Sequence, residues 1–162
     1  MPKTAVYPGS FDPVTNGHID IVERSLSIFD RIIVAVIENP SKKPLFSVSE
    51  RKEMLSEVFS GKGGVSVGSF EGLLVDFTRN NGADTVIRGL RAVSDFEYEF
   101  QMALMNRRLA PEIKSVYLMP SPEFSYISSS LIKEVYSLGG EDAGLVPPPV
   151  HRRLLERFNN AK

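Results

Sequence analysis

The sequence predicts a doubly wound α/β domain in which five parallel strands alternate with helices. Two observations carry this prediction. Apolar runs and residues with helical spacing follow one another in the order strand, helix, strand, helix as far as a fifth strand. The run Arg31–Ile37 is continuously apolar after its first residue, as expected for a strand buried on both faces of a parallel sheet. The 162 residues are predicted to form a single domain, 1–162, that ends in C-terminal helices.

The individual elements follow from local signals in the sequence. Strands are expected at residues 4–6, 31–37, 65–70, 85–87 and 115–119. The first helix should use Ile19, Val22, Leu26 and Phe29 as its apolar face. A capping box at 47–50 begins the second helix, and Asn81-Gly82 ends the third. A helix over about 94–109 should pack through Phe96, Phe100, Ala103 and Leu104, and two more helices follow Ser130 and the prolines at 147–149.

Composition excludes several classes of function. The chain is 42% hydrophobic with a formal net charge of −1, which argues against broad binding to nucleic acid or to a membrane surface. It has no cysteine, so disulfides and thiolate catalysis are excluded, and two histidines make a protein zinc site improbable. No apolar run reaches the ~18 residues of a membrane span, and no signal peptide is recognised. A cytoplasmic protein is expected.

The connection between the first strand and the first helix, Tyr7–His18, is the first candidate for a binding site. It is rich in Gly and Pro and ends with a histidine in the first helical turn. That turn carries unpaired backbone N–H groups and the positive end of the helix dipole, which favour an anion and most simply a phosphate. Taken alone, the same pattern also fits a histidine that merely caps the helix.

Three further polar segments, 39–43, 88–91 and 123–130, follow other strands of the predicted sheet. Ligands of open parallel sheets bind beyond the carboxyl ends of the strands, so we expect these segments to meet Tyr7–His18. Together they supply cations, a histidine and a serine-rich helix start, which suit several phosphates. Without a cysteine or a G-x-S-x-G elbow, the expected chemistry is transfer between bound substrates by positioning and charge stabilisation.

Two motifs in these segments carry a resemblance to a known superfamily. Thr-Asn-Gly-His at 15–18 resembles the (T/H)-x-G-H signature of the nucleotidylyltransferases, and Ile-Ser-Ser-Ser at 127–130 resembles their second, serine-rich signature. Residues 7–13, 87–92 and 95–99 narrow the resemblance to the bacterial phosphopantetheine adenylyltransferases, over nearly the whole chain. Ser10, Ser130 and Lys133 stand where many relatives have Thr, Thr and Arg, and the resemblance leaves open whether Lys133 contacts the triphosphate.

The resemblance implies a Rossmann-like fold and one reaction. ATP and 4′-phosphopantetheine would give 3′-dephospho-coenzyme A and pyrophosphate in coenzyme A biosynthesis, by direct attack without a covalent enzyme intermediate. Mg²⁺ would accompany the substrate phosphates, with no metal site in the protein itself. A homohexamer is expected, and feedback binding of coenzyme A is plausible because product and substrate share a pantetheine arm.

The resemblance also assigns site residues. His18 would stabilise the charge that develops on the transferred phosphate. The implied residues for the phosphopantetheine substrate are Ser10, Lys42, Leu74 and Arg88. The implied residues for ATP are Ser10, Phe11, His18, Gly89, Leu90, Arg91, Glu99, Phe124, Ser125, Tyr126, Ile127, Ser128, Ser129 and Ser130.

Alternative interpretations remain open at this stage. Lys42 could be a solvated loop charge, and Arg88 and Arg91 could pair with Asp95 or Glu99 only to hold a loop. Glu99 could bind the ribose or amine of ATP, or could orient an arginine. For the whole chain, the alternatives are an adenylyltransferase for another phosphorylated acceptor, such as nicotinate mononucleotide or glycerol phosphate, and a nucleotide-binding sensor without catalysis.

Overall fold

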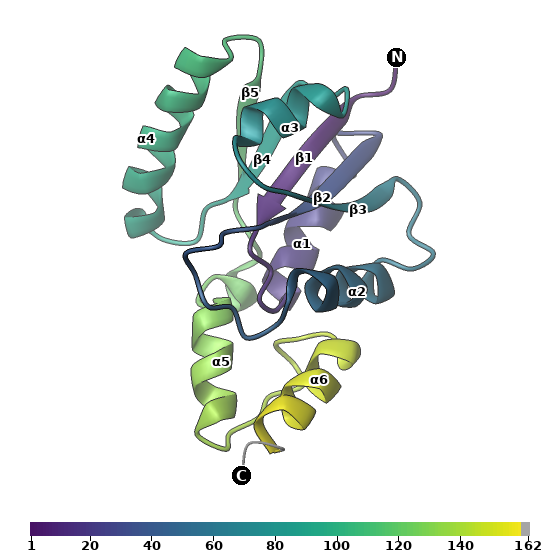
Figure 1. The fold of residues 1–162 in the computed structure, drawn as a ribbon, viewed down its shortest axis with the longest axis vertical. Helices are drawn as coiled ribbons and strands as arrows, with labels where there is room; N and C mark the ends of the chain where they lie inside the picture. The colour runs from purple at the N-terminus through teal and green to yellow at the C-terminus, as the bar shows by residue number, and fades with distance from the viewer. Residues whose placement is uncertain (160–162) are drawn as a thin grey trace.

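The computed structural model describes residues 1–159, except for the side chains of Val93 and Ser94. Within them, a five-stranded, all-parallel sheet has the order β3-β2-β1-β4-β5 (Figure 1). The strands are β1 (Thr4–Gly9), β2 (Arg31–Ile37), β3 (Val65–Phe70), β4 (Thr85–Gly89) and β5 (Lys114–Leu118). The chain runs outward from β1 to β3 and then returns to add β4 and β5 on the other side. The predicted doubly wound α/β fold is therefore confirmed.

Helices cover both faces of this sheet and extend beyond its carboxyl edge. They are α1 (Asn16–Ser25), α2 (Val48–Val58), α3 (Leu74–Asn80), α4 (Val93–Leu109), α5 (Ser129–Ser137) and α6 (Pro148–Asn159), with a 3₁₀ turn, η1 (Pro122–Phe124), before α5. Figure 1 shows α5 and α6 below the sheet, beyond the ends of the strands. None of the described helices is long and apolar enough to cross a membrane.

Side-chain alternation along the strands explains how both faces of the sheet form a hydrophobic core. In β2, Ile32, Val34 and Val36 join the large core beneath α1, α2, α5 and α6, whereas Ala35 belongs to the core on the α3 face. Successive side chains of a strand point to opposite faces, so a continuous apolar run fills both cores. The predicted reason for the continuous run at 31–37 is confirmed.

The ladder between β1 and β4 is short. It consists of the pairs Ala5↔Thr85 and Val6↔Val86, whereas β1 and β2 pair over the full range from Thr4↔Arg31 to Gly9↔Val36. Strand order reverses between β1 and β4, and this is where open parallel sheets bind their ligands. The two strands part before their carboxyl ends, which leaves room there for a cavity.

Local signals were confirmed at several helix ends. Ser47 and Glu50 form the predicted capping box of α2, and Gly82 has a left-handed φ of 68° after the end of α3. Helix α1 ends at Ser25, earlier than its apolar spacing predicted, so Phe29 packs into the core from the turn that follows.

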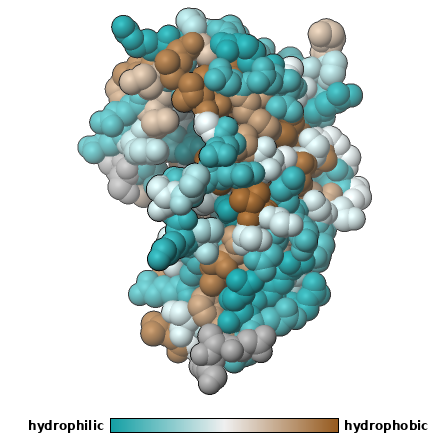
Figure 2. All heavy atoms as spheres, viewed as in Figure 1, coloured by the Kyte–Doolittle hydropathy of each residue, from teal (hydrophilic) through white to brown (hydrophobic). Residues whose placement is uncertain are grey.

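One prediction about packing was wrong. Phe96, Phe100 and Leu104 of α4 were expected to be buried, but about half of the surface of each is exposed. Among the described side chains of α4, the buried one is charged, that of Glu99. Figure 2 shows hydrophobic residues at the surface over the upper end of α4. Helical spacing identifies an apolar face correctly, but it does not identify what covers that face.

Candidate active site

A cavity of about 600 Å³ lies at the carboxyl ends of β1 and β4, between the starts of α1 and α5. All four segments that the sequence predicted to meet contribute to its wall. The predicted residues that line it are Ser10, His18, Lys42, Arg88, Gly89, Arg91, Glu99, Phe124, Ile127, Ser128, Ser129 and Ser130. The N-termini of two helices, α1 and α5, therefore open into the same space, and the positive ends of their dipoles favour an anion there.

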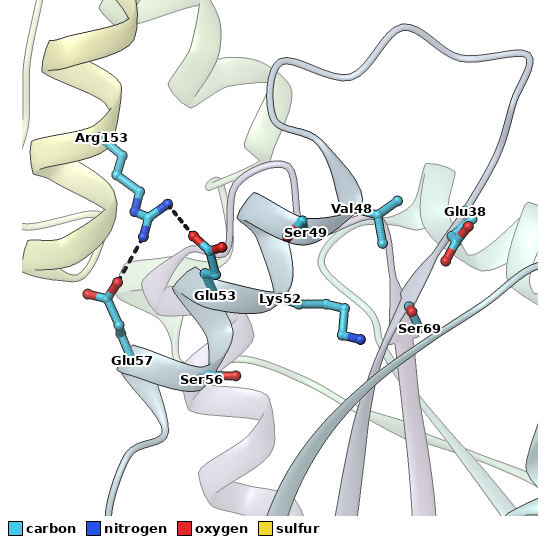
Figure 3. A pocket seen from close by; sticks show the side chains of 9 residues that line it. All are labelled: Glu38, Val48, Ser49, Lys52, Glu53, Ser56, Glu57, Ser69 and Arg153. Carbon is cyan, nitrogen blue, oxygen red and sulfur yellow. Dashed lines mark hydrogen bonds and ion pairs between the residues drawn. The ribbon is translucent and has the colours of Figure 1, made fainter.

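A second, more open cavity of about 740 Å³ lies between α2, α6 and the ends of β2 and β3. Figure 3 shows Arg153 turned toward Glu53 and Glu57, to which it is hydrogen bonded at 3.3 and 2.9 Å. With Glu38 and Lys52, this wall carries three carboxylates and two cations. A surplus of negative charge suits polyphosphate poorly, so the smaller cavity is the better candidate for a phosphate site.

His18 is held by the N-cap of its own helix. The backbone N–H of Thr15 donates to Nδ1 of His18 at 3.0 Å, and the Thr15 hydroxyl accepts from the His18 backbone N–H. Because Nδ1 accepts a hydrogen bond, the proton of the neutral ring belongs on Nε2. The capping box therefore fixes the tautomer in which Nε2–H is a donor.

The ring of His18 is neutral at physiological pH. Burial and, to a smaller extent, the positive charge of Arg91 together lower its pKa to about 4. The Phe11 ring packs edge-on against it with centroids 5.0 Å apart, and Tyr7 lies at 6.3 Å. Phe11 is fully buried and supports His18 from behind, so the structure places it outside the wall of the cavity.

Arg88 is oriented by Glu99. The Nε and Nη2 groups of Arg88 donate to the two carboxylate oxygens of Glu99 at 3.0 and 2.7 Å. Burial alone would lower the pKa of Arg88, but the hydrogen bonds and charge of Glu99 raise it above the ordinary arginine value. The Tyr117 hydroxyl donates to the backbone carbonyl of Glu99 at 3.1 Å and steadies this turn of α4. Of the two roles considered for Glu99, this geometry matches the orientation of an arginine.

Arg91 links two walls of the cavity. Its backbone N–H and its Nε both donate to Asp95, at 3.1 and 3.3 Å, and its Nη1 donates to the carbonyl of Ile127 at 2.8 Å. The loop after β4 is thereby tied to the residue that precedes the serine-rich start of α5. At that start, Ser128 is the N-cap and Ser129 donates to the carbonyl of Pro13 at 2.7 Å.

Some residues assigned by resemblance lie outside the cavity wall. Leu74 begins α3 and packs, partly buried, against two apolar clusters. The backbone N–H of Leu90 donates to the carbonyl of Leu118 at 3.0 Å, and the Ser125 hydroxyl donates to the carbonyl of Pro122 at 2.8 Å. Tyr126 is largely exposed.

Other residues line the cavity although the sequence gave them no role there. They include Asp95 and Tyr98, on α4. Residues 95, 98 and 99 are three and four positions apart, so they share one face of a helix. Once Glu99 was assigned to the site, helical spacing could have added Asp95 and Tyr98.

The cavity at the switch point of a parallel sheet, with two helix N-termini and two oriented arginines, is that of a nucleotide-binding α/β domain. Comparison with known proteins narrows this class. Residues 6–135 match the model of the cytidylyltransferase-like family. Phosphopantetheine adenylyltransferases from Moorella thermoacetica and Heliobacterium modesticaldum are 56% and 55% identical to the chain. Each alignment covers 96% of this chain, and 98% and 93% of the respective relative.

The chain therefore belongs to the cytidylyltransferase-like family, and within it to the phosphopantetheine adenylyltransferases. Solved structures with low identity share its fold. A Vibrio parahaemolyticus protein described as a nicotinate-nucleotide adenylyltransferase has a TM-score of 0.71 at 19% identity, covering 96% of this chain and 99% of its own. A bifunctional NMN adenylyltransferase/ADP-ribose pyrophosphatase from Francisella tularensis has a TM-score of 0.68 at 14% identity, covering 99% of this chain and 52% of its own.

Proposed function

We propose that this chain transfers the adenylyl group of ATP to 4′-phosphopantetheine, giving 3′-dephospho-coenzyme A and pyrophosphate. The observation that carries the proposal is the identity of more than half of the sequence, over nearly the whole chain, with relatives named for this activity. The cavity supports it independently, because its wall carries three cations, Lys42, Arg88 and Arg91, and so suits more than one phosphate group.

The reaction needs one bond to form and one to break. A phosphate oxygen of the acceptor attacks the α-phosphorus of ATP, and the bond from that phosphorus to the β-bridging oxygen breaks, so pyrophosphate leaves. Two anionic substrates repel each other, and cations are needed to bring them together. Arg88 and Lys42 would hold the acceptor phosphate, while Arg91 and the start of α5 would hold the triphosphate.

His18 would act as a neutral hydrogen-bond donor. Its Nε2–H would meet a non-bridging oxygen of the α-phosphate, on which negative charge grows during transfer. A donor whose position and tautomer are already fixed needs no reorganisation as that charge develops. Because the ring is neutral with a pKa of about 4, proton transfer from His18 is not part of the proposed mechanism.

Mg²⁺ would be held by phosphate oxygens and water. The described residues contain no group of three or more His, Cys, Asp or Glu side chains placed to hold a metal. The carboxylates on the cavity wall, Asp95 and Glu99, already accept hydrogen bonds from Arg91 and Arg88. A substrate-bound Mg²⁺ fits this donor set, and it would neutralise part of the triphosphate charge.

The proposal includes assembly and regulation. The exposed hydrophobic side chains of α4 support a homohexamer, because they are open to contact with other copies of the chain. These side chains lie on two sides of α4, with Phe96, Phe100 and Leu104 on one side and Tyr98, Met105 and Leu109 on the other. We also propose a cytoplasmic enzyme in which coenzyme A competes for the pantetheine part of the site, without nucleic-acid or membrane partners.

A pyrophosphate-release assay on a panel of substrates tests the proposed function. ATP and CTP are offered as donors, each with 4′-phosphopantetheine, nicotinate mononucleotide or glycerol 3-phosphate as acceptor. We expect release with ATP and 4′-phosphopantetheine only. Release with another acceptor alone would identify a different adenylyltransferase, and absence of release from all combinations, with ATP binding retained, would indicate a nucleotide sensor.

A further inference from the structure

Asp12 is a buried carboxylate that lies just outside the cavity wall. It is 4% exposed and follows the fully buried Phe11 in the loop between β1 and α1. Its Oδ1 accepts from the backbone N–H of Phe46 at 2.9 Å, and its Oδ2 accepts from that of Leu45, also at 2.9 Å. Burying a carboxylate is costly unless hydrogen bonds and a nearby positive charge compensate it, and the two amides supply only the hydrogen bonds.

Lys133 supplies the compensating charge. Its Nζ lies 3.0 Å from Oδ2 of Asp12, although the two residues are 121 positions apart in sequence. Lys133 projects from α5, the helix whose first turn carries Ser129 and Ser130, but it is not among the residues that line the cavity. In this structure the Lys133 ammonium group forms an ion pair with the Asp12 carboxylate.

Asp12 joins the two sides of the proposed site. We define the acceptor loop as residues 38–47, which connect β2 to α2 and carry Lys42. Asp12 holds the end of the loop through its hydrogen bonds to Leu45 and Phe46. Arg51 holds both sides of its base, because it donates to the carbonyl of Ile37, just before the loop, at 3.4 Å and to that of Ser47, its last residue, at 3.3 Å. The residues around Lys42 are exposed. The base of the loop is thus fixed, and its tip is open to a ligand.

We propose that Asp12 and Lys133 are positioning residues: Lys133 holds the Asp12 carboxylate, and Asp12 sets the acceptor loop so that Lys42 faces the acceptor phosphate. The identity of that acceptor rests on the proposed function. Loss of the lysine leaves a buried carboxylate without the cation beside it, and breaking such a pair is far more costly than never having made it. The carboxylate then draws in water and releases the two amides that hold the loop.

The test compares Lys133→Met, Lys133→Arg and a matched control, Lys62→Met. Lys62 pairs with Glu23 at the surface, and neither residue lines the cavity, so it controls for removing a paired lysine. The first measurement is hydrogen exchange at the Leu45 and Phe46 amides. In Lys133→Met we expect exchange at these two amides to rise roughly tenfold, which corresponds to about 1.4 kcal/mol, and to stay at the parent rate in Lys133→Arg and in the control.

The second measurement separates the two substrates. For Lys133→Met we expect the KM for 4′-phosphopantetheine to rise roughly tenfold, while calorimetry finds ATP affinity within about twofold of the parent. Lys133→Arg should restore the parent KM. A purely structural defect would instead lower the active fraction, and so kcat, without this split.

Two outcomes would overturn the inference. Weaker ATP or pyrophosphate binding in Lys133→Met, with unchanged exchange at Leu45 and Phe46, would place Lys133 on the triphosphate. Unchanged exchange together with unchanged KM would leave the pair without a positioning role. If the parent enzyme shows no turnover with 4′-phosphopantetheine, the proposed function is refuted. Hydrogen exchange at the Leu45 and Phe46 amides still tests whether Asp12 and Lys133 position the loop.

Discussion

Replacing Glu99 by alanine should destabilise the fold and misplace Arg88. Glu99 is 8% exposed, and both of its carboxylate oxygens accept hydrogen bonds from the Arg88 guanidinium. In Glu99→Ala that guanidinium loses its counter-charge at a position where a quarter of its side chain reaches solvent. Breaking a fully buried pair costs about 3–5 kcal/mol, and the partial exposure of Arg88 reduces our expectation to about 2–3 kcal/mol.

Urea unfolding, followed by far-UV circular dichroism at one fixed protein concentration, measures this cost. The double variant Arg88→Met/Glu99→Leu serves as the matched comparison, because it removes both charges and keeps apolar volume. It should be more stable than Glu99→Ala, since no uncompensated charge remains. Costs of Arg88→Met and Glu99→Leu that simply add in the double variant would show that the two side chains do not act as a pair.

A milder variant, Glu99→Gln, addresses function. The amide keeps one acceptor oxygen but lacks the charge, so Arg88 loses orientation while the fold is largely kept. Because Arg88 is assigned to the acceptor, the KM for 4′-phosphopantetheine should rise several-fold more than the Kd for ATP. The opposite order, with ATP binding weakened more, would refute the orienting role and would indicate that Glu99 contacts ATP directly.

Three further predictions concern the histidine, the acceptor loop and α4. His18→Ala should bind ATP within a few-fold of the parent but lose most turnover. Between about pH 6.5 and about pH 4, the unfolded chain takes up a proton at His18 and the folded chain does not. The parent should therefore lose stability as the pH falls through that window, and His18→Gln should lose less. Lys42→Ala should weaken 4′-phosphopantetheine binding more than ATP binding by calorimetry, whereas Lys43→Ala, at a neighbouring exposed position, should change neither. Phe100→Glu should shift the sedimentation coefficient to that of a smaller assembly, and Met119→Glu, an exposed apolar residue outside α4, should not.

The sequence predicted the features that depend on local chemistry and on topology. The capping box at Ser47 and the left-handed Gly82 are short-range signals, and the structure confirms both. The meeting of the four loop segments followed from a rule about parallel sheets, which holds whatever the details of packing. A pairing of Arg88 with Asp95 or Glu99 was one of the alternatives considered, and the structure shows the pairing with Glu99.

The sequence could not show which residues far apart in the chain share a buried charge. Asp12 and Lys133 are 121 positions apart, and although each belongs to or adjoins a motif, neither motif indicates that the two side chains pair. Arg51, on α2, is as buried as Asp12, and its Nη1 donates to the carbonyl of Ser10 at 2.8 Å. Such contacts depend on the conformation of the loops, which residue type and spacing do not predict.

The arginines on the cavity wall explain how a chain with a net charge of −1 can gather several phosphates. Each guanidinium has five N–H donors. Arg88 gives two of them to Glu99, and Arg91 gives one to Asp95 and one to Ile127, so each retains three donors for a ligand. The carboxylates therefore hold the cations in place without using up their capacity to bind phosphate. Because the orientation of each arginine is fixed during folding, little side-chain entropy remains to be lost when the substrates bind.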